Sequence, residues 1–574
     1  MTPVLAASKH SAAADLGTEA LIARIRDSVI GERTTMPGPY GARPLVYADF
    51  IASGRALGFL EEAIAQTVLP LYGNTHTETS VTGRETTALR EEARQIIAKA
   101  LGAGPQHAVI FTGTGATAAI DRLVRGMGIE ALVRAGQAPV VFVGPYEHHS
   151  NDLPWRESGA VIERIGLTAT GQIDLEHLNA RLGAHPGPGL KIGAFSAASN
   201  VTGIRTDLSA VARLLHQHGA RFVCDFAAAA PYIDMRLQLD GVDAQARIDA
   251  IVYSSHKFIG GPGASGVLVA EKSLFTTARP GVTGGGTVSY VTADHHSYVR
   301  DIERREEAGT PGIIGDIRAG AVMALKQAVG APEIERREHA LVSAALQQLA
   351  QAPGVEVLGP LEHERIGVVS FNITANGRRL HYGFVVALLN DLFGIQARGG
   401  CSCAGPYGHD LLGISAQTSR AYEGAIARGH SLMRPGWVRL GYNYFFDAET
   451  ADYLTQAILF IAENGARFLC DYEVDTVNGI WRHRAGRGTV SASLGAFWAQ
   501  PERPEAQKLH DLARYYDLAQ ELADARALPD LGRAAVFDAD CEALRDFWMP
   551  QDVGAQPAAT SASRAVADAQ RAKA

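Results

Sequence analysis

Short β-rich runs alternate with helical stretches between about residue 46 and residue 320, and this alternation restricts the fold more than any other feature of the chain. The runs are Val109–Thr112, Val140–Val143, Ile192–Phe195, Arg221–Asp225, Ile251–Ser254 and Gly266–Val269. Repeated strand–helix–strand units predict a mostly parallel sheet with helices on its faces. We therefore expect an α/β domain that binds its ligand in the crevice at the carboxyl ends of the strands.

The chain must contain more than one domain, since 574 residues are too many for a single hydrophobic core. We predict an N-terminal arm over residues 1–45, a large α/β domain over 46–330 and a smaller α+β domain over 331–465. A helical extension of unknown role follows over 466–550. The end of the chain, 551–574, is rich in Ala, Ser, Gln and Arg and is predicted to be a disordered tail.

Composition excludes several classes of function. A net charge of −8 provides no basic face for nucleic acid. No apolar run approaches the ~20 residues of a membrane span, and the N-terminus lacks the layout of a secretory signal. Five cysteines in a chain of this length do not form a disulfide framework. We expect a cytoplasmic protein that binds neither nucleic acid nor membrane.

Two predicted strands end in residues that suit the cofactor pyridoxal phosphate (PLP). Asp225 closes the run 221–225, and Lys257 follows the run 250–254 just before a glycine-rich turn. A lysine in the crevice can form a Schiff base with an aldehyde cofactor, and a carboxylate there can hold a protonated pyridine nitrogen. Asp225 taken alone would more often be a helix cap, so the prediction depends on the pair.

Other strand ends add to this pattern. Thr114-Gly115-Ala116 joins a strand to an apolar helix, whose free N–H groups can bind phosphate, although the turn alone resembles an ordinary βα connection. His148 can stack on the pyridine ring and relay protons, and the amide of Asn200 can hydrogen-bond its phenolic oxygen. A histidine follows His148 directly, but no third ligand has suitable spacing, so we expect no metal.

These motifs, taken in order, resemble those of the class V aminotransferase superfamily, and within it the cysteine desulfurase and selenocysteine lyase group. The resemblance extends from about Tyr47 to Phe460. The matching motifs are Tyr47-Ala-Asp49, Tyr72–His76, Glu147–His149, Ser199-Asn200, Asp225, Ser254–Lys257, Gly284–Thr287 and Glu307–Pro311. Singly most of them are weak, but together they are highly specific.

The resemblance implies a PLP-dependent transferase of fold type I, usually a homodimer with active sites at the subunit interface. It implies that Ser254 and His256 lie at the cofactor phosphate and that Thr287 reaches the phosphate of the other subunit. It also implies that His76 lies on the substrate side and that Arg398 binds the substrate carboxylate. A guanidinium suits that role because it binds a carboxylate through two parallel hydrogen bonds.

Two positions depart from the family pattern. Ala228 stands where many desulfurases carry a glutamine, so one hydrogen bond to the phenolic oxygen is missing. Gly115-Ala116 stands where family members often carry two threonines, which leaves more of the phosphate binding to backbone amides.

Arg398-Gly-Gly-Cys401-Ser-Cys403 is the second informative motif. The desulfurase group places its sulfur-accepting cysteine shortly after the carboxylate-binding arginine, and Cys403 occupies that position. The spacing also resembles the desulfurase domain of molybdenum cofactor sulfurases. From the residues alone, packing in a glycine-rich turn, a redox pair, and a metal site with His409 remain alternatives.

The predicted function is that of a PLP-dependent cysteine desulfurase that converts L-cysteine to L-alanine, leaves a persulfide on Cys403, and passes the sulfur to an acceptor protein. The expected catalytic residues are Lys257, Cys403 and His148, and the expected substrate-binding residues are Arg398, Asn200 and His76. One alternative is another class V PLP enzyme, namely an aminotransferase, an epimerase or a C–S β-lyase. A second, of another class, is a non-catalytic scaffold or sulfur-relay partner.

Overall fold

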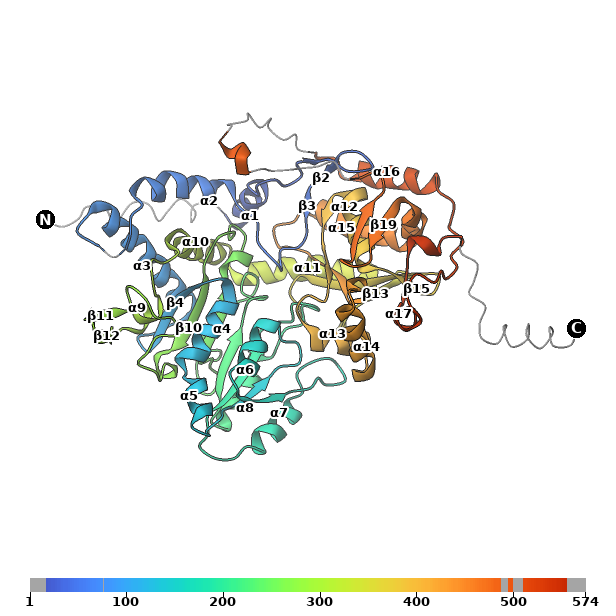
Figure 1. Ribbon diagram of the computed structural model, residues 1–574. Coiled ribbons are helices and arrows are strands. Elements are labelled where there is room, and N and C mark those ends of the chain that lie inside the picture. Colours follow the sequence, from blue (N-terminus) through green and yellow to red (C-terminus); the bar gives the residue numbers. More distant parts are fainter. Residues whose placement is uncertain (1–16, 76, 487–493, 499–508, 555–574) are drawn as a thin grey trace, which may run out of the picture.

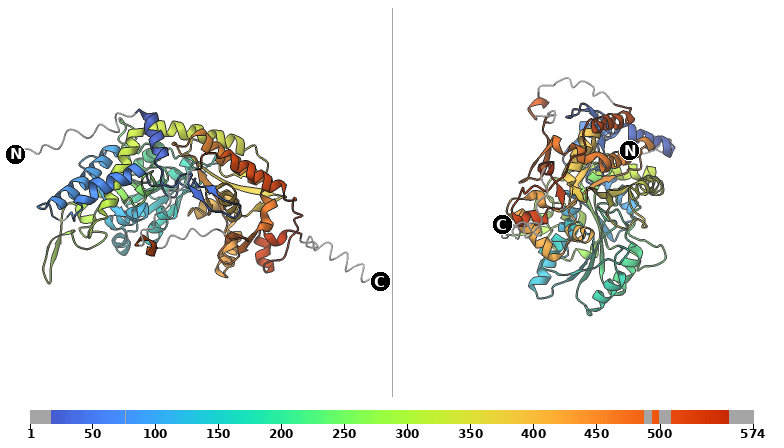
Figure 2. Two further views of the ribbon diagram at one scale, coloured as in Figure 1. Left: turned by 90° about the horizontal axis from the view of Figure 1, so that it is seen from above. Right: turned by 90° about the vertical axis from the view of Figure 1, so that its right-hand side faces the viewer.

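The computed structural model describes residues 17–75, 77–486, 494–498 and 509–554. Two lobes lie side by side, and the long helix α11 (Ala331–Leu349) runs from one lobe to the other (Figure 1). Seen from above, the molecule forms a shallow arch (Figure 2).

A seven-stranded sheet forms the large lobe. Its strands are β4 (His107–Gly113), β5 (Val140–Val143), β6 (Val161–Arg164), β7 (Lys191–Ser196), β8 (Arg221–Asp225), β9 (Ala250–Ser254) and β10 (Gly266–Glu271). They lie in the order β4-β10-β9-β8-β7-β5-β6, and only β10 runs antiparallel to its neighbours. The predicted, mostly parallel α/β sheet is therefore confirmed. The edge strand β6 was missed because it ends in Glu163 and Arg164 and none of its residues is buried.

Helices cover both faces of this sheet, which explains why its strands read as continuous apolar runs. Side chains of β9 alternate between the two cores: Ile251 and Tyr253 join one, and Val252 joins the other. The first core includes residues of α3 (Val81–Leu101), α8 (Leu208–Gln217) and α10 (Ile313–Val329), and the second includes residues of α4 (Gly115–Gly126).

The smaller lobe contains a second, mainly antiparallel sheet. Its strands are β13 (Val355–Val357), β14 (Val368–Ala375), β15 (Arg378–Leu380), β17 (Arg398–Gly400), β18 (Trp437–Gly441) and β21 (Phe547–Trp548). The order is β17-β18-β14-β15-β21, with β13 beside β14. Helices α12 (Tyr382–Phe393) and α15 (Ala448–Asn464) pack on this sheet.

The remaining elements are shorter or peripheral. They are α1 (Thr18–Asp27), α2 (Gly58–Ala63), α5 (Ile129–Arg134), α6 (Leu153–Glu157), α7 (Leu175–Gly183), α9 (Ile302–Glu306), α13 (Gly405–Leu412), α14 (Ala416–Ala427), β1 (Thr35–Met36), β2 (Arg43–Pro44), β3 (Val46–Tyr47), β11 (Val288–Val291), β12 (His296–Tyr298) and β16 (Ile395–Gln396). Strand β3 pairs with β16, so the segment that enters the large lobe is hydrogen-bonded to the small one.

The sequence predicted a helical C-terminal extension, but the extension also contains strands. It contains α16 (Ala513–Asp524) and α17 (Ala539–Leu544), but also the hairpin β19 (Tyr472–Asp475) and β20 (Ile480–His483). Its strand β21 pairs with β15 and so extends the sheet of the small lobe. Asn478-Gly479 in the hairpin turn is a typical hairpin signal, whereas a strand as short as β21 leaves no pattern. Of the predicted tail, residues 555–574 lie outside the described residues.

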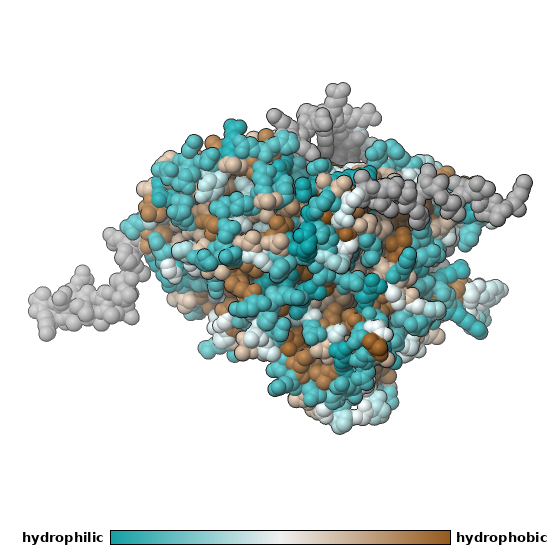
Figure 3. Space-filling view, turned by 180° about the vertical axis from the view of Figure 1, so that it is seen from behind, coloured by the Kyte–Doolittle hydropathy of each residue, from teal (hydrophilic) through white to brown (hydrophobic). Residues whose placement is uncertain are grey.

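None of the described helices is long and apolar enough to cross a membrane. Figure 3 shows hydrophobic side chains gathered at the centre and lower end of the face opposite that of Figure 1, between hydrophilic ones.

A buried ion pair between Arg545 and Asp552 stabilises the C-terminal extension and provides a first testable prediction. Asp552 accepts hydrogen bonds from Arg545 at 2.5 and 3.1 Å and from the backbone N–H groups of Ala534 and Met549, and both charged side chains are fully buried. Asp552→Asn should destabilise this segment by about 3–5 kcal/mol, because the Arg545 charge loses its fully buried partner and keeps only Glu542, at 3.0 Å, among the described residues. Hydrogen exchange of residues 531–554 and urea unfolding measure the effect.

Asp546→Asn is the matched control, since the Arg379–Asp546 pair is exposed and should contribute about 1 kcal/mol or less. Equal exchange rates in the two variants would contradict the assignment of Asp552 as the residue that holds the extension together.

Candidate active site

A cavity of about 220 Å³ lies at the carboxyl ends of β7, β8 and β9, and residues of the small lobe close it. Of the predicted site residues that the structure describes, all but Thr287 line it: Thr114, Gly115, Ala116, His148, Asn200, Asp225, Ser254, His256, Lys257, Arg398 and Cys403. Ala228 and Arg439 are among its further lining residues. Side chains that are far apart in the sequence are thus brought to one crevice, as expected for an open α/β sheet.

Lys257 and Asp225 form the centre of the cavity. Asp225 ends β8 with 4% of its surface exposed, and its Oδ1 accepts a hydrogen bond from the Ala227 N–H at 2.7 Å. Burial raises the pKa of the Asp225 carboxyl, and the positive charge of Lys257 opposes this shift. Burial lowers the pKa of the Lys257 amine to about 8, against the smaller opposing effect of Asp225. The lysine can therefore supply a neutral amine near physiological pH.

The turn before α4 has the geometry of a phosphate site. Gly115 has φ +63°, and a Cβ there would lie 2.7 Å from the Ser254 hydroxyl and 2.9 Å from the His256 ring. The Ala116 N–H donates to the Ser254 hydroxyl at 2.9 Å. This cradle would be filled by any larger residue at position 115, and the first N–H groups of α4 face an anion favourably. The residues present therefore fit the phosphate of PLP, and Lys257 and Asp225 fit its aldehyde and ring nitrogen.

His148 stays neutral at physiological pH. Burial, and then the charge of Lys257, lower the pKa of its imidazole to about 3. Its Nδ1 accepts a hydrogen bond from the Ser150 N–H at 3.1 Å, which fixes the ring. A neutral, oriented imidazole beside the cavity can present its face to an aromatic ring.

Asn200 connects the two lobes. Its Nδ2 donates to the Ser402 carbonyl at 2.7 Å, and its Oδ1 is buried without a hydrogen-bond partner among the described residues. The amide nitrogen carries a second hydrogen that remains available for a phenolic oxygen. Sequence reasoning had given Asn200 only a role toward the cofactor and substrate, and the structure adds this contact to the segment that carries the cysteines.

Cys403 lies on a turn with unusual backbone geometry. Ser402 and Cys403 have φ angles of +53° and +55°, and the Ala404 N–H donates to the Cys401 carbonyl at 3.2 Å. Side chains other than glycine adopt this conformation at a cost of about 1–2 kcal/mol each. The large lobe holds the turn, because the His149 N–H donates to the Cys403 carbonyl at 2.9 Å and Asn200 binds Ser402. Such strain is typical of functional sites.

Arg439 is a site residue that sequence reasoning missed. It lies on β18 directly opposite Arg398 of β17, is 3% exposed, and lines the cavity. Its guanidinium donates to Asp49 Oδ1 at 3.1 Å and to the Asn200 carbonyl at 3.0 Å, while its buried Nε has no partner within the described chain. An arginine inside the otherwise apolar run Trp437–Gly441 was the available signal. Two adjacent guanidinium groups make this side of the cavity suitable for a carboxylate.

Thr287 is the described site residue that does not line this cavity. The buried Thr287 donates to the Gly284 carbonyl at 2.7 Å and lies at the base of the β11–β12 hairpin, which projects from the large lobe (Figures 1 and 2). His76 lies outside the described residues. Glu307 does not line the cavity either, and its carboxylate forms ion pairs with Arg90 and Arg94 of α3.

Comparisons with known proteins identify the family of the chain. The model of the family "Aminotransferase class-V" matches residues 46–421. A probable cysteine desulfurase of Halalkalibacterium halodurans is 31% identical over 367 residues, which are 63% of this chain and 85% of the relative. A cysteine desulfurase of Klebsiella pneumoniae is 31% identical over 371 residues, with the same coverage.

Solved structures give the same result. A cysteine desulfurase from Thermococcus onnurineus matches with a TM-score of 0.60 and 25% identity, over 73% of this chain and 95% of that one. A cysteine desulfurase from Escherichia coli matches with a TM-score of 0.58 and 24% identity, over 72% and 93% of the two chains, and supports the fold alone.

The fold and the cavity define a PLP-dependent enzyme of fold type I. The chain belongs to the class V aminotransferase family, whose model matches more than half of its length. Within that family it is similar to cysteine desulfurases.

The lowered pKa of Lys257 yields a second prediction. Only the neutral amine attacks an aldehyde, so PLP uptake by the cofactor-free protein should accelerate about tenfold per pH unit up to about pH 8 and then level off. An ordinary lysine, with a pKa of 10.5, would continue to accelerate through pH 9. Visible absorption of the bound cofactor follows the rate.

Lys257→Ala is the control and should not develop this absorption. A rate that still rises steeply above pH 9 would show that the amine is not shifted.

Proposed function

We propose that the protein is a PLP-dependent cysteine desulfurase that converts L-cysteine to L-alanine and receives the sulfur on Cys403 as a persulfide. The observation that carries the proposal is that Cys403, on its strained turn, lines the same cavity as Lys257 and Asp225. The relatives named cysteine desulfurase support it.

PLP supplies an electron-accepting ring, and the chain supplies the groups that hold the cofactor and move protons. Asp225 would hold the ring nitrogen, and its buried carboxylate favours the protonated ring. Lys257 would attach the cofactor and, once released, accept and return the α-proton of the substrate through its neutral amine. The phosphate would lie on the N-terminus of α4 beside Ser254 and His256.

The paired arginines would orient the substrate. Arg398 and Arg439 can bind the carboxylate of L-cysteine, and Arg439 is itself fixed by Asp49 and Asn200. Orientation at this end determines which bond at the α-carbon and β-carbon faces the reacting groups.

Sulfur transfer to Cys403 balances without an added oxidant or reductant. The Cys403 thiolate attacks the substrate sulfur, an S–S bond forms, and the C–S bond breaks. The electron pair of the broken bond remains with the carbon, which takes up a proton to become the methyl group of alanine. Arg439 interacts electrostatically with Cys403 across the cavity.

A homodimer would complete the site. Thr287 lies at the base of a projecting hairpin whose residues Tyr290 and Val291 are 67% and 58% exposed. Large exposed apolar side chains on a projecting element suit an interface. In this proposal the hairpin contacts a second copy, Thr287 approaches the phosphate of that copy, and a sulfur-acceptor protein receives the persulfide sulfur.

A third prediction tests the persulfide. Cys403→Ser should reduce alanine formation from L-cysteine by about two orders of magnitude or more and leave PLP binding intact, because only the sulfur nucleophile is removed. Alanine and sulfide are measured by amino-acid analysis and a sulfide assay. Cys401→Ser is the matched control in the same turn and should retain activity.

Full turnover in Cys403→Ser would eliminate the persulfide route. Pyruvate and ammonia as the products of the unmodified protein would instead identify a C–S β-lyase. This outcome is worth measuring because Ala228 stands where many desulfurases carry a glutamine.

A fourth prediction concerns the substrate carboxylate. Arg398→Lys should raise the KM for L-cysteine about ten- to a hundredfold, since lysine cannot form the paired hydrogen bonds. Cofactor absorption should be unchanged. Arg434→Lys is the matched control, because this exposed arginine does not line the cavity. An unchanged KM in Arg398→Lys would assign the carboxylate to Arg439 alone.

A further inference from the structure

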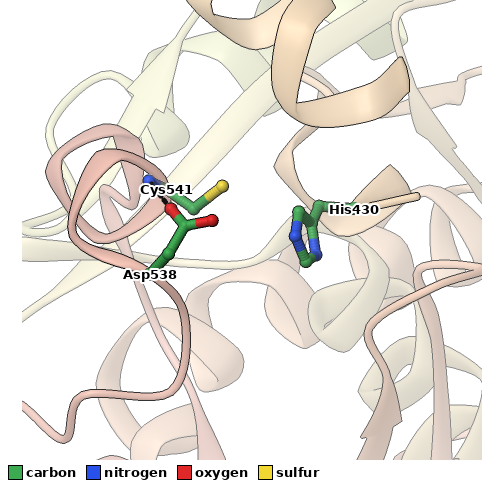
Figure 4. Close-up of side chains that lie close together, drawn as sticks. All are labelled: His430, Asp538 and Cys541. Carbon is green, nitrogen blue, oxygen red and sulfur yellow. Dashed lines mark hydrogen bonds between the residues drawn. The ribbon is translucent and has the colours of Figure 1, made fainter. Parts of the chain in front are cut away.

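A second group of reactive side chains lies outside the cofactor cavity, where the C-terminal extension meets the small lobe. His430, Asp538 and Cys541 have ligand atoms that all lie within 4.8 Å of one another, and none of the three lines the cavity. His430 precedes the short turn Ser431–Met433 of the small lobe, whereas Asp538 and Cys541 belong to the extension. Figure 4 shows the sulfur and the carboxylate on the side that faces the imidazole. The cluster therefore spans the junction between the extension and the small lobe.

The backbone holds two of these groups in a fixed relation. Asp538 is the N-cap of α17, and its Oδ1 accepts a hydrogen bond from the Cys541 N–H at 2.8 Å. One oxygen is thereby used, and the other remains available. The side chains of an N-cap and of the third helical residue lie on one turn, so Asp538-x-x-Cys541 behaves as a preformed pair of ligands.

His430 completes the set from the opposite side. Its ring packs edge-on against Phe537 with 5.5 Å between the ring centres, which fixes its position. Neither ring nitrogen forms a hydrogen bond to any residue in the described part of the chain. A histidine held in place with both nitrogens unused is available to a ligand.

We propose that His430, Asp538 and Cys541 bind one divalent transition-metal ion, of the kind represented by Zn²⁺, and that the ion fastens the extension to the small lobe. Imidazole, thiolate and carboxylate together are a ligand set that Zn²⁺ accepts, with water as the fourth ligand. Asp538 is exposed and His430 partly so, which leaves an open side for that water. Tetrahedral bonds of about 2.0–2.3 Å place ligand atoms about 3.3–3.8 Å apart, so small side-chain rotations close the site.

Arg428 is the competitor for this site. Its guanidinium donates to the Cys541 sulfur at 3.4 Å, and the side chain is exposed and free to move away. On binding, the Cys541 thiol releases its proton to solvent, the metal–sulfur bond forms, and the Arg428 contact is lost. Removal of Arg428 should therefore strengthen metal binding, a result that a purely packing role for these residues does not predict.

Titration of the full, PLP-loaded chain with Co²⁺ tests the proposal. Tetrahedral, thiolate-bound Co²⁺ absorbs between about 600 and 700 nm, away from the cofactor. One equivalent should produce this band. His430→Ala and Cys541→Ser should each weaken binding about tenfold or more, and Arg428→Ala should tighten it. Zn²⁺ should abolish the band and raise the Tm of the unmodified protein but not of His430→Ala.

Cys470→Ser, at an exposed cysteine, is the matched control and should bind normally. Cys403→Ser distinguishes this site from the active-site cysteines. Absence of the band in the unmodified protein, or its loss in Cys403→Ser with retention in His430→Ala, would overturn the proposal. Alanine production from L-cysteine is measured separately, so failure of either proposal does not affect the other.

Discussion

The buried amine of Lys257 beside the carboxylate of Asp225 is the interaction on which the site depends. Burial away from water disfavours the charged form of both groups. The attraction between the two charges reduces this cost for each of them. The parallel sheet brings the two residues together because β8 and β9 are neighbours and end at the same edge. Helices on both faces exclude water from the strands, so the amine is desolvated enough to remain a nucleophile.

The small lobe supplies the remaining side chains of the cavity. Contacts from the large lobe hold the turn 401–404, and Arg439 of the small lobe reaches back to Asp49 and Asn200. The position of Cys403, the proposed sulfur nucleophile, is therefore fixed by the orientation of the two lobes and not by the turn alone. A change at the junction of the lobes would move Cys403 relative to Lys257 without altering either residue.

The sequence predicted those parts of the site that follow a strand and missed those that depend on distant contacts. Asp225, Lys257 and the Gly115 turn carry a local signature because each comes directly after an apolar run. Arg439 interrupts an apolar run, but only the folded chain shows that this arginine faces the cavity. The contact of Asn200 with Ser402 joins residues about two hundred positions apart. Thr287 does not line the cavity of its own chain. The resemblance assigns it to the phosphate site of a second subunit, which a single chain does not contain.

Strand β21 of the extension covers one edge of the sheet in the small lobe. Without it, β15 would be the outer strand of the small sheet and would present unpaired N–H and C=O groups to solvent. Exposed strand edges recruit other chains into aggregates. The curated relatives match 63% of this protein. Removal of the extension would leave the backbone groups of β15 open to pairing with another chain, so the extension protects this lobe from edge-to-edge association.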